Sequence, residues 1–221
     1  MKRLYLVISW LITVVVPFFL IMTAIRLLLN PALLKFEYNS PNFPPDTYGF
    51  TTQDRLKWGG LTLDYLLNTS DISFLADLKF SDGTPIYNDR ELSHMHDVKT
   101  LIQHMITAWY ILIGVLLAVG VWAWLGHWMA TFWQGISRGG WLTIALIAVI
   151  LVFVFTSFES LFTDFHEIFF TGNSWIFLYS DTLIRLFPLP FWQDAFTFMG
   201  GFTIIGALLF GYGGHKLARR F

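Results

Sequence analysis

Two short polar segments of this chain combine histidine with carboxylates, and each borders a long apolar run. The first is Glu91-Leu-Ser-His-Met-His-Asp-Val-Lys99, and the second is Phe165-His-Glu-Ile-Phe-Phe170. Ionisable residues are costly near a membrane, and those found there are commonly functional. Histidine is the side chain best suited to move a proton near neutral pH. If both segments face the same side of a membrane, they predict one acid–base active site.

The first histidine segment is expected to be helical. On that helix Glu91, His94 and Asp97 recur every three residues, so we expect them to share one face. His96 points about 200° away from His94, because each helical residue advances about 100°, and it is expected to be solvated. His94 is therefore the candidate catalytic residue of this segment, with a neighbouring carboxylate to hold its tautomer. The second segment contributes His166.

Three further groups of residues extend the candidate site. Glu167, next to His166, or Asp164, two residues before it, is expected to orient that ring. Arg185 either pairs with Asp181, four residues earlier in the chain, or binds a lipid phosphate or a substrate carboxylate. The remaining supporting or substrate-binding candidates are Asn173, Trp175 and Tyr48.

A metal centre is the main chemical alternative to metal-free acid–base chemistry. Zinc ligands would come from His94-x-His96, His166, Glu159, Asp164 and Glu167. Residues two apart diverge on a helix, however, so chelation by His-x-His fits a strand better. The chain contains no cysteine, which excludes disulfides, thiolate catalysis and cysteine metal sites. Its serines lack the Gly-x-Ser-x-Gly elbow of a classical serine hydrolase.

The composition identifies the kind of protein that must position these residues. Of 221 residues, 55% are hydrophobic, 19% aromatic and only 13% charged, whereas soluble domains carry about 25% charged residues. The mean hydropathy is +0.58. The sequence therefore predicts an integral membrane protein. A net charge of −1 gives no reason to expect nucleic acid binding.

The apolar runs predict an all-α integral membrane protein with four transmembrane helices. A spanning helix needs about 20 mostly apolar residues, and the predicted spans are 1–29, 105–125, 141–158 and 195–213. An extracytoplasmic domain is expected over 30–104, between the first and second spans. An extracytoplasmic interfacial or re-entrant segment is expected over 159–194, between the third and fourth. Residues 126–140 are expected to form a cytoplasmic interfacial loop, and 214–221 a cytoplasmic tail.

Basic residues set the expected orientation, because cytoplasmic loops are enriched in lysine and arginine. With both termini in the cytoplasm, the inner segments hold Lys2, Arg3, Arg138, Lys216, Arg219 and Arg220. All acidic residues then lie in the two outer stretches. The initial Met1-Lys-Arg and its apolar run are interpreted as an uncleaved anchor, because the run is long and no cleavage site follows.

Local patterns predict several elements of the outer stretches. Thr51-Thr-Gln-Asp54 resembles a capping box that opens a helix running to about Thr69. Phe74–Phe80 fits either a helix or a strand. Ser81-Asp-Gly-Thr-Pro85 is typical of a turn. Leu186-Phe-Pro-Leu-Pro190 cannot continue a helix.

The order of the motifs resembles one known family. Asp46-Thr-Tyr-Gly-Phe, the two histidine segments, Asn173-Ser-Trp175 and Asp181-Thr-Leu-Ile-Arg-Leu-Phe-Pro188 follow one another along the chain. This arrangement is similar to the small four-span membrane family that contains the bacterial lipoprotein intramolecular transacylases (Lit). The resemblance covers nearly the whole chain, including the number of spans.

The resemblance implies an O-to-N acyltransferase in the bacterial cytoplasmic membrane that needs no cofactor. It implies a diacylated bacterial lipoprotein as substrate and membrane lipid as a further partner. The sn-2 acyl chain of the diacylglyceryl-cysteine would move to the cysteine α-amino group and give the lyso-form lipoprotein. The two histidines implicated in that family correspond by motif to His94 and His166, on the extracytoplasmic face.

Two other classes of function remain open from the sequence. One is a membrane hydrolase or acyltransferase that acts on free phospholipid, with or without a metal. The other is a non-enzymatic membrane assembly factor. Transport is disfavoured, because the predicted spans carry no charged residue at their midplanes.

Overall fold

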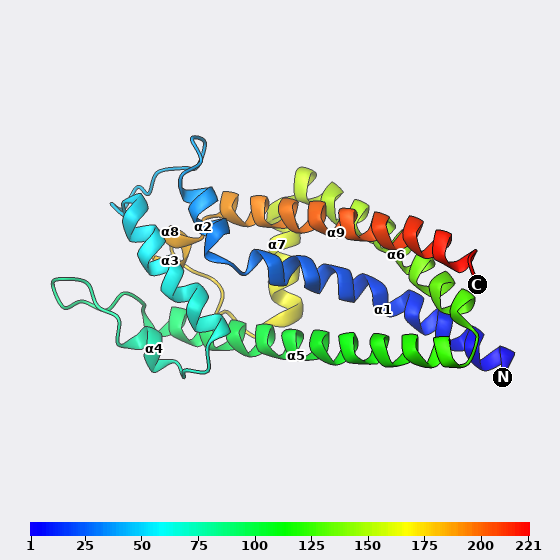
Figure 1. The fold of residues 1–221 in the computed structure, drawn as a ribbon. Coiled ribbons are helices and arrows are strands. Elements are labelled where there is room, and N and C mark those ends of the chain that lie inside the picture. Colours follow the sequence, from blue (N-terminus) through cyan, green and yellow to red (C-terminus); the bar gives the residue numbers. More distant parts are fainter. The chain divides into compact units, whose positions relative to one another are not determined.

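The computed structural model describes residues 1–221, and almost all regular structure in it is helical (Figure 1). The helices are α1 (Lys2–Leu28), α2 (Pro31–Tyr38), α3 (Thr52–Leu67), α4 (Ser73–Ala76), α5 (Asp89–Leu125), α6 (Met129–Thr156), α7 (Phe158–Phe169), α8 (Thr182–Leu186) and α9 (Leu189–Ala218). The exception is an isolated antiparallel bridge between Lys79 and Pro85.

Four of the helices are long and apolar enough to cross a membrane, namely α1, α5, α6 and α9. The all-α fold with four spans is thus confirmed. The predicted loop over 126–140 is wrong for most of its length. The chain turns at Gly126–Trp128, with His127 in a left-handed conformation (φ 53°), and α6 begins at Met129. Trp128 lies directly before α6, and Trp133 lies within it.

The chain divides into two compact units. Unit 1 contains Met1–Leu27, Met105–Thr156 and Phe196–Phe221, and unit 2 contains Leu28–His104 and Ser157–Ala195. The two segments of unit 2 nearly coincide with the stretches that the sequence predicts outside the membrane. Which side of the membrane they occupy stays a prediction.

In unit 1, small residues let α6 approach α1 and α9 closely. A Cβ atom on Gly135 would lie 2.6 Å from the backbone oxygen of Ser9, and one on Gly140 would lie 2.5 Å from the backbone nitrogen of Gly211. Close approach of this kind is the usual basis of helix packing in membranes. Arg138 is held there too, since its guanidinium donates to the hydroxyl of Ser9 at 2.7 Å.

In unit 2, local capping fixes α3, as predicted. The Thr51 hydroxyl accepts from the backbone nitrogen of Asp54, and the Asp54 carboxylate accepts from the backbone nitrogen of Thr51. The helix ends at Leu67 and carries Trp58 and Tyr65 into a core shared with α8. The stretch 74–80, for which helix and strand were both open, contains the end of the short α4 followed by the bridge.

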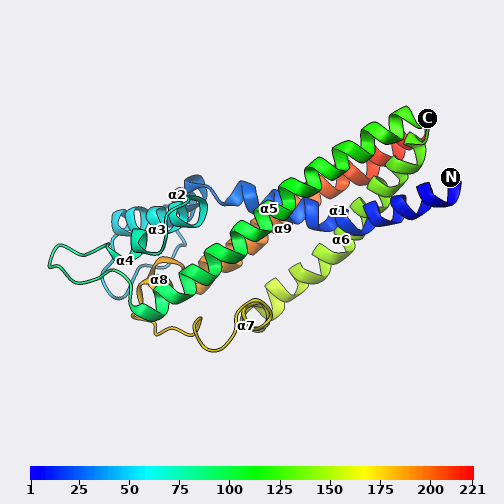
Figure 2. The same cartoon turned by 90° about the horizontal axis from the view of Figure 1, so that it is seen from below.

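The predicted interfacial segment 159–194 consists of three distinct parts. Amphipathic α7 is followed by the non-helical stretch 170–181, and α8 precedes the start of α9. Ser157 is not helical and lies between α6 and α7 in the sequence; Figure 2 labels both helices. Pro188 lies between α8 and α9, so the predicted break in this region is confirmed.

Unit 2 also contains a pair of carboxyl groups, Glu37 and Asp194, that contacts neither His94 nor His166. Glu37 on α2 is buried and lies against Asp194 in the first turns of α9. Burial, together with the charge of Asp194 and a hydrogen bond to it, raises the pKa of Glu37 to about 7. The second oxygen of Glu37, Oε1, has no hydrogen-bond partner.

We expect Glu37→Gln to change how stability depends on pH. The folded state holds the Glu37 proton more tightly than the unfolded state, so this group stabilises the fold below about pH 4.5 and loses its contribution as the pH rises to about 7. The difference in melting temperature between Glu37→Gln and the parent should therefore shift in favour of the variant across that window. Thermal unfolding in detergent at several pH values measures it, and a constant difference would contradict the assignment.

Candidate functional site

His94 and His166 face each other inside unit 2. Their ring centroids are 5.8 Å apart and the ring planes are inclined by 27°. Both side chains are buried, with exposed fractions of 6% and 8%. His94 comes from the start of α5 and His166 from the last turns of α7. Two segments separated by some seventy residues of chain therefore meet, as required for a shared acid–base site.

Aromatic rings enclose the histidine pair. Phe170 contacts both histidines, with centroid distances of 4.9 Å to His94 and 5.5 Å to His166. Phe177 lies 5.4 Å from His94, and Trp175 lies 5.0 Å from His166. The two histidines are thus shielded from water, which strengthens their electrostatic interactions with a reacting group.

The main chain of α7 fixes the tautomer of His166. Its Nδ1 lies 2.7 Å from the backbone oxygen of Phe162, one turn earlier in the helix. A carbonyl oxygen only accepts hydrogen bonds, so Nδ1 carries the proton. The neutral ring then presents the lone pair of Nε2, which is the form required of a general base.

His94 is held differently. Its Nδ1 is buried and has no hydrogen-bond partner. Unpaired buried polar atoms are rare in proteins, and a catalytic role is one recognised explanation for them. The His94 ring is held by packing alone, against Phe170, Phe177 and His166. Its Nδ1 is therefore not committed to a hydrogen bond within the protein.

Burial keeps both rings uncharged at neutral pH. His94 belongs to the part of α5 in unit 2, before the apolar stretch that begins at Met105. Because α5 has 37 residues, it is about 55 Å long, which exceeds the roughly 30 Å thickness of a bilayer core. The start of α5, which carries His94, therefore lies outside the spanning part. Burial, helped by the neighbouring His166, lowers the pKa of His94 to about 4. Burial also lowers the pKa of His166, opposed by its bond to Phe162.

Glu91 does not hold the His94 tautomer as expected. Its buried carboxylate accepts from the backbone nitrogen of Asn88 at 2.8 Å and from that of Leu183 at 2.7 Å. Asn88 reciprocates by accepting from the backbone nitrogen of Glu91. Glu91 therefore caps the start of α5 and the start of α8 together. Its place in the site is that of a support for the helix that carries His94.

Asp97 and Glu167 lie on exposed faces of their helices. The Asp97 side chain is 48% exposed and approaches only His96, at 3.7 Å. Six residues of a helix turn through about 600°, which leaves Asp97 about 120° away from Glu91. The prediction that Glu91, His94 and Asp97 share one face was therefore wrong for Asp97. Glu167 is also exposed, as is Asp164.

We expect Asp97→Asn and Glu167→Gln to leave activity within about twofold of the parent, as for most surface substitutions. Neither carboxylate has a recorded interaction with His94 or His166. Initial rates of product formation by the purified variants measure this. A large loss in either variant would mean that the carboxylate reaches a histidine when substrate is bound.

Arg185 pairs with Asp46 and not with Asp181. Its guanidinium donates two hydrogen bonds to the Asp46 carboxylate at 3.1 and 3.0 Å, and a third to the backbone oxygen of Tyr48. The carbon of the guanidinium lies 3.4 Å from the centre of the Phe50 ring. Asp181 instead accepts from the backbone nitrogen of Leu178. Arg185 thus ties the 46–50 loop to α8.

Of the other candidates, only Trp175 contacts a histidine. Tyr48 and Asn173 are exposed, and the backbone oxygen of Asn173 closes a turn with Ile176. Sequence reasoning missed the roles of Phe162, Phe170 and Phe177. Phe162 could have been found from the sequence, because it lies one helical turn before His166 and its backbone oxygen is the partner of that ring. Nothing in the local pattern singled out Phe177.

Of the proposed zinc ligands, only His94 and His166 lie together. No group of three or more histidine, cysteine, aspartate or glutamate side chains lies close enough to hold a metal ion. His96, Glu159, Asp164 and Glu167 are all exposed.

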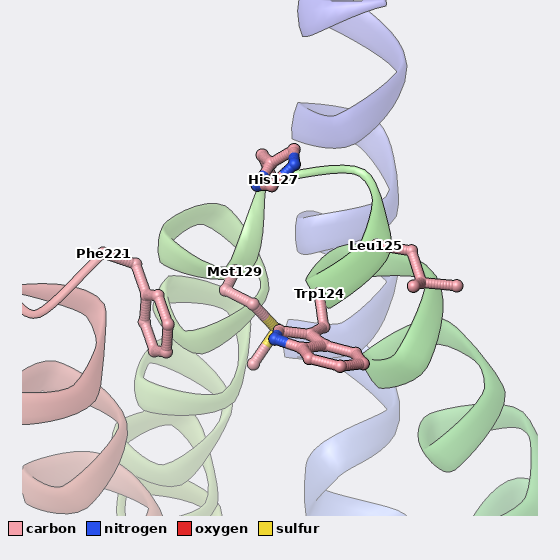
Figure 3. A pocket seen from close by; sticks show the side chains of 5 residues that line it. All are labelled: Trp124, Leu125, His127, Met129 and Phe221. Carbon is pink, nitrogen blue, oxygen red and sulfur yellow. The ribbon is translucent and has the colours of Figure 1, made fainter.

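A cavity of about 350 Å³ lies elsewhere, in unit 1. It is lined by Trp124, Leu125, His127, Met129 and Phe221, which Figure 3 shows around the turn between α5 and α6. His127 is its only ionisable side chain, and no candidate catalytic residue lines it. Its size therefore does not make it the active site, since the convergent ionisable groups lie in unit 2.

Comparison with known proteins connects this geometry to a family. The model of a family described as lipoprotein intramolecular transacylase Lit matches residues 10–192. A protein of Aquifex aeolicus (strain VF5), described only as uncharacterized, is 28% identical over 202 residues, which cover 91% of this chain and 90% of that protein.

Solved structures agree on the fold. The in meso structure of the membrane integral lipoprotein intramolecular transacylase Lit from Bacillus cereus matches with a TM-score of 0.78 at 18% identity, covering 100% of this chain and 98% of that one. A variant of that protein with a histidine-to-alanine mutation matches with a TM-score of 0.74 at 19% identity, covering 99% and 96%.

Proposed function

This chain belongs to the Lit family of lipoprotein intramolecular transacylases and is therefore an acyltransferase, and we propose that the His94–His166 pair is its catalytic centre. The observation that carries the proposal is the buried contact of the two rings at 5.8 Å. No other cluster of side chains in unit 2 combines two neutral groups that can accept a proton with surrounding aromatic rings.

The proposed substrate is a bacterial lipoprotein whose N-terminal cysteine carries a diacylglyceryl group. The acyl chain on the sn-2 oxygen moves to the α-amino group of the same cysteine, which leaves a lyso-form lipoprotein. One ester bond breaks and one amide bond forms, and the glycerol oxygen gains the proton that the amine loses.

In the proposed mechanism His166 is the base. The α-ammonium group first releases one proton to water. The free amine then attacks the sn-2 ester carbonyl, and Nε2 of His166 removes the second proton from the attacking nitrogen. His94 donates a hydrogen bond to the oxyanion of the tetrahedral intermediate. As the intermediate collapses, the His166 imidazolium gives this proton to the departing glycerol oxygen, which leaves a neutral amide and a neutral hydroxyl group. If both rings were protonated, their positive charges would repel each other, so the pair holds one proton at a time.

No covalent acyl-enzyme is needed. Donor and acceptor belong to one molecule, and holding them in register recovers much of the roughly 7–11 kcal/mol available to well-oriented intramolecular reactions. Phe170, Trp175 and Phe177 exclude water from the histidines and so limit hydrolysis of the ester.

The proposal places the reaction at the outer face of the bacterial cytoplasmic membrane. The four apolar helices make this a multi-pass membrane protein. The distribution of basic residues supports a cytoplasmic location for both termini. Unit 2, with both histidines, then lies on the extracytoplasmic side.

Mass spectrometry of one lipoprotein's N-terminus, with and without this protein, tests the function. We expect conversion of the diacyl form to the lyso form at unchanged total mass, with the acyl chain on nitrogen. Incubation with phospholipid alone should release no fatty acid. Fatty acid release without N-acylation would instead identify a phospholipid hydrolase.

The pH profile reports the histidine environment. Because burial lowers the pKa of His166 below its ordinary 6.5, the base stays neutral in weak acid. We expect the acid limb of kcat/KM to have its midpoint below pH 6.5. Rates measured with a lipopeptide between pH 4 and 9 determine it, and a midpoint at or above 6.5 would mean that the base is a solvated group.

A further inference from the structure

Unit 2 exposes a row of large apolar side chains beside the histidine pocket. Ile168 and Phe169 in the last turn of α7 are 74% and 44% exposed. Ile176, Leu178 and Tyr179 in the following loop are 49%, 65% and 82% exposed. These five residues are called the apolar edge below. Contiguous exposed apolar surface commonly marks a site of interaction with a protein or a membrane.

The backbone of the apolar edge is held firmly, although its side chains are uncovered. Leu178 donates its backbone N–H to the Asp181 carboxylate at 2.8 Å. The backbone oxygen of Ile176 accepts from the Arg90 guanidinium at 3.1 Å, and Asn88 donates to Asp181. The loop is therefore tied to the start of α5, and its apolar side chains are presented on a fixed backbone.

The same loop has an inner side that forms the active site. Trp175 and Phe177 contact His166 and His94, while Ile176 and Leu178 between and after them are exposed. One short stretch of chain therefore carries both the side chains that enclose the histidines and three members of the apolar edge.

We propose that the apolar edge is immersed in the lipid leaflet next to the active site, so that acyl chains reach the histidines without crossing water. Chain continuity is the main argument. The membrane-spanning α6 ends at Thr156 and α7 begins at Phe158, so the start of α7 lies within about 7 Å of the end of the span. Tyr179 fits this location, since tyrosine is enriched at membrane interfaces.

The benefit of lipid immersion for acyl transfer rests on the proposed function, but the test of immersion itself does not. The chain contains no cysteine, so single-cysteine variants can carry a fluorophore without a background. Leu178→Cys and Tyr179→Cys are labelled with an environment-sensitive dye and reconstituted into phosphatidylethanolamine–phosphatidylglycerol vesicles containing brominated acyl chains. Ser81→Cys, in the exposed turn between Phe80 and Thr84, is the control.

We expect strong quenching and a blue-shifted emission at positions 178 and 179, and little of either at 81. Quenching no greater than at position 81 would overturn the proposal. The proposal would also be overturned if the dyes at 178 and 179 reported an apolar environment without quenching by the lipid bromines. Such an environment, appearing only on self-association or on addition of lipoprotein, would identify a protein contact instead. The same measurement in a His166→Asn background separates immersion from catalysis, because immersion should persist in an inactive protein.

A kinetic measurement provides the second test. Leu178→Glu should raise KM for a vesicle-borne lipopeptide several-fold and leave kcat near the parental value, because the side chain points away from the histidines. KM for the same lipopeptide in detergent micelles should change less. A fall in kcat with unchanged KM would contradict a lipid-facing role.

Discussion

Replacing His166 with asparagine is expected to slow acyl transfer by a factor on the order of 10² to 10⁴, the usual contribution of a positioned general base. The asparagine amide nitrogen takes roughly the place of Nδ1, so it can keep the hydrogen bond to the backbone oxygen of Phe162. The amide has no lone pair that accepts a proton near neutral pH. The variant should therefore fold like the parent and lack the base.

Mass spectrometry of the lipopeptide product measures the rate, and thermal unfolding checks the fold. His96→Asn is the matched control, because His96 is 65% exposed and has no recorded contact with the pair. Added imidazole should partly restore His166→Ala. Product formed by purified His166→Asn at the parental rate would show that another group is the base.

Replacing Glu91 with alanine is expected to give the largest loss of stability. The substitution leaves the buried backbone N–H group of Leu183 and the part-buried one of Asn88 without an acceptor. The buried group costs about 1–3 kcal/mol, and the part-buried group, which water can reach, adds less. Both α5 and α8 lose a cap at once. The stability is read from thermal or denaturant unfolding in detergent.

Glu91→Gln should fall between the parent and Glu91→Ala, because one amide oxygen still accepts a hydrogen bond. Asp97→Ala, an exposed carboxylate on the same helix, should be close to neutral. If Glu91→Ala unfolds like the parent yet loses activity, then Glu91 acts in the chemistry and not as a cap.

The sequence predicted the parts of this fold that depend on local patterns. The four apolar helices and the capping box at Thr51 follow from composition and from residues three apart. His94 was preferred over His96 by helical phase, and their exposures agree. These properties are set within one helix, so a single sequence carries them.

The sequence did not predict interactions that depend on tertiary contacts. Glu91 looked like a partner for His94 because the two lie one turn apart, but one of its oxygens accepts from Asn88 and the other from Leu183 of α8, ninety-two residues away. For Arg185 the local pattern left open a pair with Asp181 or a bound anion, whereas the fold pairs it with Asp46. In both cases a partner distant in the sequence takes the place of the expected one, and no local pattern encodes its position.

The hydrogen bond from His166 to the carbonyl of Phe162 bears on how this family can diverge. Many catalytic histidines are oriented by an acidic side chain, which a single codon change can remove. Here the orienting atom belongs to the main chain, and every residue type supplies the same oxygen. Position 162 can therefore drift without disturbing the tautomer, provided that α7 stays helical. The tautomer of His166 therefore depends on the helical backbone alone, while the packing of its ring still depends on neighbours such as Phe162, at 4.2 Å.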